Sequence, residues 1–289
     1  MSTRPDHIKE FSYHIHWRSS SHRPGNHRSN QRGMGMEFRG HATLLSYPDP
    51  RRIDIRQTIR DPMEQIHVRI FNQKSASPVF VLCDMSGSMQ YGSHQRKISI
   101  AGDITQSVAQ TVTHNGDPFG FIGFDDEIRE DWLATLSGRP HMAIEMAEAL
   151  KSYQPGEVGS KALIDTVRML PRTRSLIFLV SDFHMPIKDL EESLVLMLRH
   201  HIIPVILWDT AEYSDLPDFG IANVTDPESG AKRTLFLRKE YKKRILESFA
   251  ARRKTIEDLF LQFDMQPFFV SNQFDADLLS DYFHQYVAA

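Results

Sequence analysis

The sequence has little of several features that would identify a simple class of protein. It holds one cysteine, Cys83, among 289 residues, which excludes an intrachain disulfide. The apolar stretch around Cys83 favours a reduced thiol in the core. The longest apolar runs, such as 175–180 and 201–208, are far shorter than the roughly 20 residues that cross a bilayer. These absences exclude a disulfide scaffold and predict no membrane span.

A secretion signal and a strong net charge are also lacking. The first 17 residues contain no continuous apolar segment before a small-residue cleavage site, so we expect a cytoplasmic protein. The net charge of -3 hides an asymmetry: residues 1–76 hold 13 Lys and Arg against 7 Asp and Glu, and the remainder holds 21 against 30. Half of the 14 histidines also lie in residues 1–76. The chain therefore has a basic, His-rich front and an acidic body, without internal repeats.

The front segment, residues 1–76, shows no pattern of an independent hydrophobic domain. "FSYHIHW" (11–17) and "IHVRIF" (66–71) alternate between apolar and polar residues, which favours strands with one wet face. Residues 18–35 are rich in Ser, Gly, Asn and Arg and predict a loop. We predict a largely β segment that packs on the rest of the chain, is unfolded when expressed alone, and offers surface to a partner.

From residue 77 onwards, strands and helices alternate. This rhythm predicts an α/β domain over 77–289 with a doubly wound, mostly parallel sheet, so that the front segment is an N-terminal, largely β appendage. The strands at 79–82, 118–124 and 176–180 lack polar alternation and should be central and buried on both faces. A β-hairpin insertion is predicted near 220–238, with its turn at 227–230. Helices are predicted at about 98–112, 139–152, 160–170, 189–201, 239–263 and 275–287, and further strands at 202–208 and 267–271.

The stretch "DMSGSM" (84–89) follows the first of these buried strands directly. An extended backbone after the strand would send Asp84, Ser86 and Ser88 the same way, and Gly87 would allow the curvature that brings them together. Ligands of open parallel sheets sit beyond the carboxyl ends of the strands. One carboxylate and two hydroxyls are ligands for a hard cation, above all Mg²⁺, with Mn²⁺ or Ca²⁺ as alternatives.

Two further residues extend this predicted metal site. Asp182 follows the strand at 175–180, in the same topological position as Asp84. Ser160 lies at a predicted helix start, where its hydroxyl could reach the metal or merely cap the helix.

The same residues resemble a known family. "DMSGSM" after a strand, "GS" before a helix and "SD" after another strand look like the metal-ion-dependent adhesion site of von Willebrand factor A domains. The family pattern of Asp-x-Ser-x-Ser, Thr and Asp falls on Asp84, Ser86, Ser88, Ser160 and Asp182, with Ser in place of Thr at 160. The resemblance implies a bound metal with an open position, which an acidic residue of a partner protein fills.

A narrower resemblance covers roughly residues 29–230. "SNQRGMGMEF", "DPRRIDIRQTIRDP", "SMQYG", "GDPFGFIGF" and "VTDPESG" look like the bacterial von Willebrand factor A-like proteins encoded beside MoxR-type AAA+ ATPases, including the MxaS type. The usual tryptophan of "IDWR" is Ile55 here. The resemblance implies a chaperone-like protein that acts with the ATPase, or on its client, in maturing or remodelling protein complexes, metalloenzymes among them.

An enzyme is the first alternative, as a metal-assisted hydrolase that uses the same site. "DMSGSMQ" lacks the second Asp of phosphoryl-transfer loops and does not match the Gly-x-Ser-x-Gly nucleophile elbow, and "GEVGSK" (156–161) has the wrong spacing for a P-loop. His184 could serve as a base, although a lone loop histidine is more often solvated. We therefore expect no enzymatic activity.

Nucleic-acid binding is the second alternative, suggested by arginines of the front segment and by basic runs at 238–244 and 252–254. The chain as a whole is slightly acidic and lacks aromatic-interleaved or zinc-finger patterns, so we expect a solvated face or a surface for an acidic protein. The histidines of "YHIHW" with His22 and His27 lack the spacing of a transition-metal site.

Overall fold

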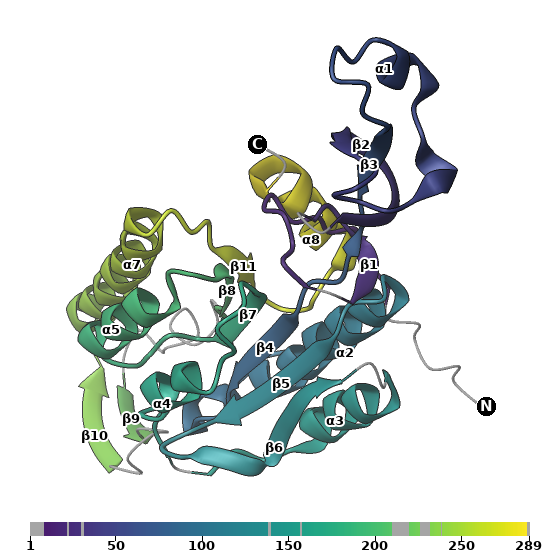
Figure 1. Cartoon of the computed structure of the whole chain (residues 1–289). Helices are drawn as coiled ribbons and strands as arrows, with labels where there is room; N and C mark the ends of the chain where they lie inside the picture. The colour runs from purple at the N-terminus through teal and green to yellow at the C-terminus, as the bar shows by residue number, and fades with distance from the viewer. Residues whose placement is uncertain are drawn as a thin grey trace. The chain divides into compact units, whose positions relative to one another are not determined.

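The computed structural model describes residues 9–21, 23–29, 32–137, 140–156, 158–209, 220–225, 232–237 and 239–287. The chain divides into two compact units (Figure 1). The small unit is Ile15–Ser77, and the large unit combines Met1–His14 with Pro78–Ala289. The division lies close to the predicted boundary at 76, but residues 9–14 belong to the large unit.

A six-stranded sheet forms the centre of the large unit, in the order β11, β8, β7, β4, β5, β6. All neighbouring strands pair in parallel except β5 and β6, which are antiparallel. The chain leaves β4 for β5 on one side and later reaches β7 on the other, so the strand order reverses at β4. The strands are β4 (Val79–Asp84), β5 (Phe119–Phe124), β6 (Ile128–Ser137), β7 (Leu176–Ser181), β8 (His201–Leu207) and β11 (Phe268–Val270).

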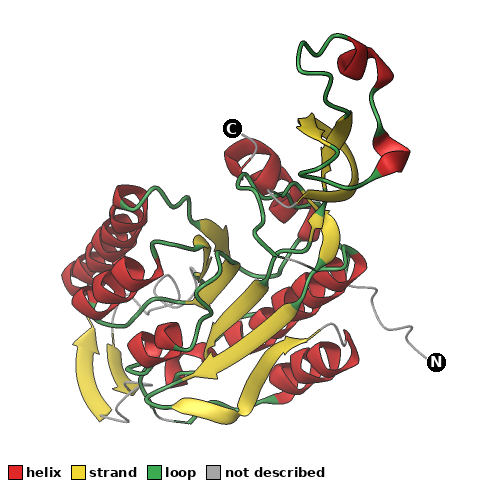
Figure 2. Ribbon diagram, viewed as in Figure 1, coloured by secondary structure: helices red, strands yellow, loops and turns green. Residues whose placement is uncertain are grey.

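Helices cover the sheet on both faces (Figure 2), which confirms the predicted doubly wound α/β fold. On one face, α4, α5 and α7 share a hydrophobic core with the sheet, formed by residues such as Leu82, Leu163, Leu190 and Phe260. On the other face, α2 contacts β4 and β5 and packs beside α3. The helices are α2 (Lys97–His114), α3 (Pro140–Ser152), α4 (Leu163–Arg168), α5 (Ile187–Met197), α7 (Lys239–Gln262) and α8 (Ala276–Tyr282), which continues into a π-helical turn, η3 (Phe283–Val287).

The prediction of three central strands is confirmed. Every residue of β4, β5 and β7 is buried, and each strand has a neighbour on both sides. Such strands accept apolar side chains at every position, which explains why their sequences do not alternate.

In the large unit and the residues next to it, one predicted strand is absent, and one observed strand was not predicted. Residues 11–17 form no strand, although Phe11 and Tyr13 are buried as their alternation suggested. The backbone N–H groups of Phe11 and Ser12 donate to the side chains of Thr111 and Ser280 rather than to a neighbouring strand. Conversely, β6 was not predicted, because its charged sequence and irregular register with β5 hide its period.

The small unit contains β1 (Pro24–His27) and an antiparallel pair of β2 (Arg32–Thr43) with β3 (His67–Asn72). β3 confirms the strand predicted at 66–71, whereas the predicted loop at 18–35 contains β1 and the start of β2. The connection from β2 to β3 carries a 3-10 turn, η1 (Pro50–Arg52), and a short helix, α1 (Ile55–Ile59).

In the region of the predicted hairpin insertion, β9 (Gly220–Thr225) pairs antiparallel with β10 (Lys232–Leu237). The turn predicted at 227–230 lies outside the described residues.

Candidate metal centre

Two aspartates meet at the carboxyl ends of neighbouring strands in the large unit. Asp84 is the last residue of β4, and Asp182 directly follows β7. The two strands pair in parallel with Cys83 opposite Val180, so their carboxyl ends lie at the same edge of the sheet. Each aspartate has 1% of its surface exposed. The structure thus places both predicted carboxylates at the point where the strand order reverses.

The serines of the first loop lie beside these aspartates. The Ser86 amide donates to Oδ1 of Asp84 at 2.9 Å, and the Ser86 and Ser88 hydroxyls are 3.1 Å apart. Hydrogen bonding by the Ser88 side chain also helps to lower the pKa of Asp182. Four of the five predicted site residues therefore form one connected, buried group.

The path of this loop differs from the prediction. The chain stays extended only as far as Ser86, because a 3-10 helix, η2 (Gly87–Gln90), begins there. Gly87 does not use a positive φ, and its N–H donates to the Val158 carbonyl at 2.9 Å. The curvature predicted for the loop thus comes from a tight helical turn that is bonded to the chain near residue 158.

Ser160 stands apart from the other four. It is buried, and the Val158 bond places its segment next to the Gly87 turn. No hydrogen bond within the described residues joins its hydroxyl to Asp84 or Asp182. The alternative of a helix cap is wrong, because α4 begins three residues after Ser160 and its N-cap residue is Ala162.

A buried lysine, which the sequence analysis missed, belongs to the same group. Lys97 begins α2, and its Nζ donates to Oδ2 of Asp182 at 2.8 Å. Its side chain has 1% of its surface exposed, as little as that of Asp182. A lysine is almost never fully buried without a partner, so the ion pair with Asp182 explains why Lys97 can be buried. The sequence feature that could have indicated this residue is the position of Lys97, eight residues after Met89 at the end of "DMSGSM".

Ser181 is the second missed residue. It ends β7, and its hydroxyl donates to Oδ2 of Asp84 at 2.6 Å. Both oxygens of Asp84 are therefore held, one by an amide and one by a hydroxyl.

The two aspartates differ in their pKa values because their surroundings differ. Burial, and next the charge of Asp182, raise the pKa of Asp84 to about 7, although hydrogen bonds from Ser181 and Ser86 favour its ionised form. Burial would also raise the pKa of Asp182, but the positive charge of Lys97 and then that of His184 outweigh it and lower this pKa. Asp182 is the ionised partner of Lys97, and Asp84 holds a proton up to near neutral pH.

The donor chemistry of this group fits a hard divalent cation. Two carboxylates and two hydroxyls offer only oxygen atoms, which Mg²⁺, Mn²⁺ and Ca²⁺ prefer. Among the described residues no three His, Cys, Asp or Glu side chains gather into a metal cluster, so the serine hydroxyls have to complete any shell. Lys97 holds one oxygen of Asp182 and competes with a cation for it.

Two further aspartates follow strands at this edge of the sheet, but the protein itself satisfies their carboxylates. Asp125 follows β5 and accepts from the Glu127 amide at 2.9 Å. Asp209 lies beyond β8 and accepts from the amide and the hydroxyl of Ser93 at 2.7 and 2.8 Å. They brace their loops.

His184, the residue considered as a base, lies close to the site. Its Nε2 is 3.8 Å from Oδ2 of Asp182, beyond hydrogen-bond distance, and its ring stacks on Trp208. The His184 ring thus contributes to the charge around Asp182 from a distance, whereas the His184 backbone amide donates to Oδ1 of Asp182 at 3.4 Å.

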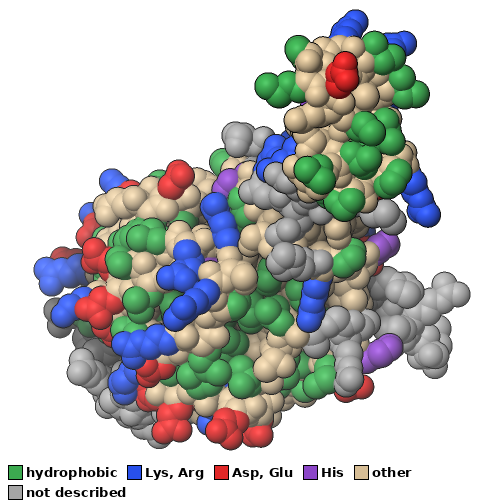
Figure 3. All heavy atoms as spheres, in the orientation of Figure 1, with side chains coloured by type: hydrophobic (Ala, Val, Ile, Leu, Met, Phe, Trp, Pro, Cys, Tyr) green, Lys and Arg blue, Asp and Glu red, His purple; other side chains and the backbone are tan. Residues whose placement is uncertain are grey.

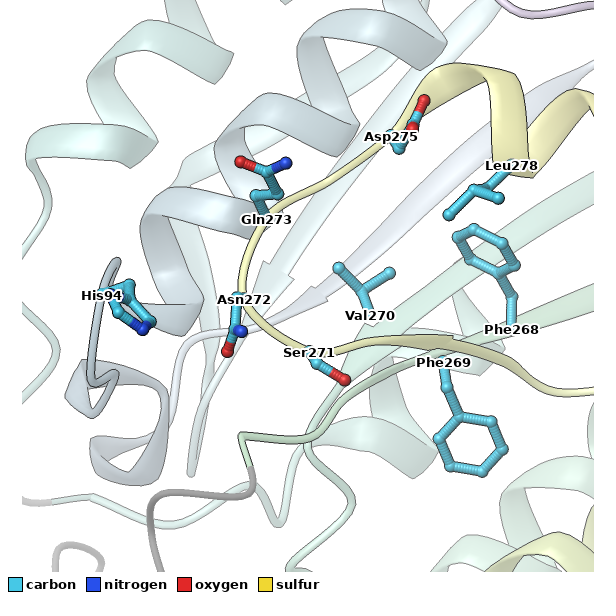
Figure 4. A pocket seen from close by; sticks show the side chains of 9 residues that line it. All are labelled: His94, Phe268, Phe269, Val270, Ser271, Asn272, Gln273, Asp275 and Leu278. Atoms are coloured by element: carbon cyan, nitrogen blue, oxygen red, sulfur yellow. The ribbon is translucent and has the colours of Figure 1, made fainter.

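A separate cavity of about 570 Å³ lies at the carboxyl end of β11. Figure 4 shows Phe268 and Leu278 at one end and His94 with Asn272 at the other. Its carboxylate, Asp275, caps α8 by accepting from the Asp277 amide. The cavity adds no candidate ligand to the metal centre.

Similar proteins were found by sequence and by structure. A protein of Paracoccus denitrificans described as "Uncharacterized protein in moxR 3'region" is 26% identical over 98 residues, which are 34% of this chain and 93% of that protein. The crystal structure of the conserved hypothetical protein BatB from Bacteroides thetaiotaomicron has a TM-score of 0.48 at 12% identity, covering 74% of this chain and all of that one.

The expectation of a cytoplasmic location has to be corrected. A solved structure that matches 70% of this chain and 94% of its own, at 14% identity and a TM-score of 0.22, is described as an uncharacterized membrane spanning protein from Vibrio fischeri. In the described part of the chain, no helix is both long and apolar enough to cross a membrane. The lack of a signal segment and of long apolar runs therefore does not assign a location.

The family described as "Protein of unknown function DUF58" matches residues 48–255, which is most of the chain. The match covers part of the small unit and runs through residues 84–89 into α7, so the chain belongs to this family.

Proposed function

We propose that this protein is a metal-dependent protein-interaction module of the von Willebrand factor A type, with an adhesion site at the carboxyl ends of β4 and β7. One observation carries the proposal: Asp84, Ser86 and Ser88, from one segment, and Asp182, from another, form one buried group of oxygen donors. The resemblance to adhesion sites rests on these four residues together with Ser160. The ion is Mg²⁺ in this proposal, with Mn²⁺ or Ca²⁺ as substitutes.

The residues of the chain divide the work at the site. Asp84, Ser86, Ser88 and Asp182 would hold the cation, and Ser160 is the fifth proposed ligand. Ser181 and the Ser86 amide fix the orientation of the Asp84 carboxylate, and Lys97 fixes that of Asp182. A bound divalent cation supplies positive charge that attracts an acidic side chain of a partner protein. The proposal involves binding and no catalytic step.

The proposed partner is a MoxR-type AAA+ ATPase or a client of that ATPase. The similarity to a protein named for its position in the moxR 3' region supports a MoxR-associated role. In this role the protein would connect the ATPase with the complexes that it matures or remodels.

Calorimetric titration of the full chain with Mg²⁺ and Mn²⁺ tests the metal site. Asp84→Ala should abolish binding, Ser86→Ala and Ser88→Ala should weaken it, and Ser160→Ala should weaken it least, since its hydroxyl stands apart. Asp209→Asn is the matched control, because Asp209 is buried beyond a neighbouring strand yet satisfied by Ser93. Equal metal affinity in Asp84→Ala and the wild type would refute the site.

Binding of a purified MoxR-type ATPase tests the partner. The wild type should bind it in Mg²⁺, lose it in EDTA and recover it when Mg²⁺ is restored, whereas Asp84→Ala should bind in neither condition. Binding that is indifferent to EDTA would contradict a metal-dependent contact.

A further inference from the structure

The connection between β2 and β3 in the small unit exposes large apolar side chains. Neither η1 nor α1 contains a buried residue. Leu45 has 95% of its surface exposed, Ile59 and Met63 each have 78%, and Ile55 has 68%. We call these four residues the apolar tip. Figure 3 shows hydrophobic side chains standing on the surface of the part that Figure 1 labels α1, β2 and β3. Several large apolar side chains exposed in one short connection are typical of an interaction site.

The apolar tip is held in place rather than loosely attached. Asp54 caps α1 by accepting from the Arg56 and Gln57 amides, and its other oxygen binds His41 and Arg69 of the β2–β3 pair at 3.0 and 2.9 Å. The His41 bond is the largest cause of a lowered pKa for Asp54, so the capping carboxylate stays ionised. The backbone of the connection joins β3 through the Asp54 amide and the His67 carbonyl. Ile55 and Ile59, one helical turn apart, are thus presented on a fixed helix face.

A hollow of about 540 Å³ lies in the same connection. Its walls are mostly apolar: Leu44, Leu45 and Pro48 from one end of the connection, Ile66 from the other, with Thr43 and Gln65. Leu45 belongs both to this hollow and to the apolar tip. An apolar hollow in the same connection as exposed isoleucines suits a segment of protein chain, whose side chains can enter it.

The charged side chains around the apolar tip indicate the sign of the charge that a partner should carry. Residues 44–66 contain four arginines and four acidic residues, yet three of the acids are engaged inside the unit: Asp49 with Arg52, Asp54 with His41 and Arg69, and Asp61 with His67. Within the described residues, no ion pair joins Arg51, Arg56 or Arg60 to a carboxylate. The outward charge is therefore mainly positive.

We propose that the apolar tip is a second docking surface, which binds an acidic amphipathic segment of a partner protein. Apolar side chains of the segment would cover Ile55, Ile59 and Met63 and enter the hollow at Leu45, and its carboxylates would meet the three arginines. A bilayer fits less well, because a flat lipid surface does not enter the hollow at Leu45. This surface is separate from the metal centre and does not depend on it.

Photo-crosslinking from the apolar tip tests which molecule covers it. The full chain, with p-benzoylphenylalanine in place of Ile59, is irradiated in its native cell, and the crosslinked peptides are sequenced. The same substitution at Val195, an exposed apolar residue of α5, is the matched control. We expect Ile59 to mark one protein segment in which Asp and Glu exceed Lys and Arg and apolar residues are present. Crosslinks to lipid, crosslinks scattered as at Val195, or none at all would overturn the proposal.

A synthetic peptide of the marked segment then measures the contact. Ile59→Asp should weaken binding at least about tenfold, because a central apolar anchor becomes a charge facing acids. Arg56→Glu should weaken it about two- to tenfold and make the affinity less dependent on salt. Val195→Asp should change nothing. Both altered residues are exposed, so thermal melts should match the wild type.

Two further arms separate this proposal from the metal-dependent function. Peptide binding should be the same in EDTA and in Asp84→Ala, so its loss there would overturn the second surface. Cosedimentation with vesicles of equal phosphatidylglycerol and phosphatidylcholine should be as weak for the wild type as for Ile59→Asp. Strong wild-type sedimentation that Ile59→Asp abolishes would identify a lipid surface instead.

Discussion

Replacing Lys97 by Met should destabilise the metal-free protein strongly. The Nζ of Lys97 lies 2.8 Å from Oδ2 of Asp182, and both side chains have 1% of their surface exposed. With an effective dielectric constant of about 20, two unit charges at this distance attract by roughly 6 kcal/mol, part of which offsets the cost of burying them. Removing one partner leaves the other charge buried alone, which costs about 3–5 kcal/mol. Lys97→Met should therefore lower the free energy of unfolding by about that amount.

The same substitution should strengthen metal binding. Without the ammonium group of Lys97, a metal ion no longer competes with it for Oδ2 of Asp182. We expect the affinity for Mg²⁺ or Mn²⁺ to rise at least about tenfold, or about 1.4 kcal/mol. Stability and metal affinity thus move in opposite directions, which a merely misfolded variant would not show.

Urea denaturation in EDTA followed by circular dichroism measures the stability, and calorimetry measures the metal. Lys161→Met is the control, because Lys161 pairs with Asp126 at the surface and should matter by less than about 1 kcal/mol. The double variant Lys97→Met with Asp182→Asn should recover most of the lost stability, since no charge is left alone. If Lys97→Met were as stable as the wild type and bound metal no more tightly, the reasoning about this ion pair would be refuted.

Two further predictions concern groups away from the metal centre. Burial, and then the nearby Arg199 and Arg174, lower the pKa of His200 to about 4. Below about pH 6.5 the unfolded chain therefore binds a proton at His200 that the folded chain does not bind, and the free energy of unfolding should fall by up to about 3 kcal/mol from pH 6.5 to pH 4. In His200→Gln, urea unfolding should lose this part of its pH dependence. An unchanged slope in His200→Gln would contradict it. The Tyr13 hydroxyl donates a hydrogen bond to the buried carboxylate of Asp117. Tyr13→Phe should therefore lower the free energy of unfolding in urea by about 1.5–3 kcal/mol, whereas Tyr286→Phe, at an exposed position, should leave it almost unchanged. Equal stability of the two variants would show that the Tyr13 bond contributes little.

The sequence predicts the centre of the fold well because its strands are buried on both faces. A strand such as 176–180 has to be apolar throughout, and this pattern is visible without any knowledge of its neighbours. The position of Asp84 and Asp182 follows from it, since parallel strands end at a common edge. Their convergence could therefore be predicted from two short motifs almost 100 residues apart.

Elements that depend on distant partners could not be predicted in the same way. Phe11 and Tyr13 alternate like a strand, but the segment finds hydroxyl groups of two helices instead of a neighbouring strand. The 3-10 turn after Ser86 depends on the Val158 carbonyl, which meets Gly87 only in the folded chain. In the sequence, Lys97 looks like an ordinary helix residue, because its burial and its partner depend on how α2 packs against β4 and β5 in the folded chain.

Lys97 also bears on why the proposed site would need a partner. Once a bound cation has displaced the proton of Asp84, the two aspartates carry two negative charges, and Lys97 cancels one of them. A divalent cation brings two positive charges, which exceed the one remaining negative charge by one. An uncompensated charge in a buried site is costly, so a carboxylate from outside would complete the balance. In Lys97→Met the two aspartates alone would balance the cation. Tight metal binding with weak ATPase binding in that variant is what this charge count requires, and strong binding of both would show that the lysine plays no part in attracting the partner.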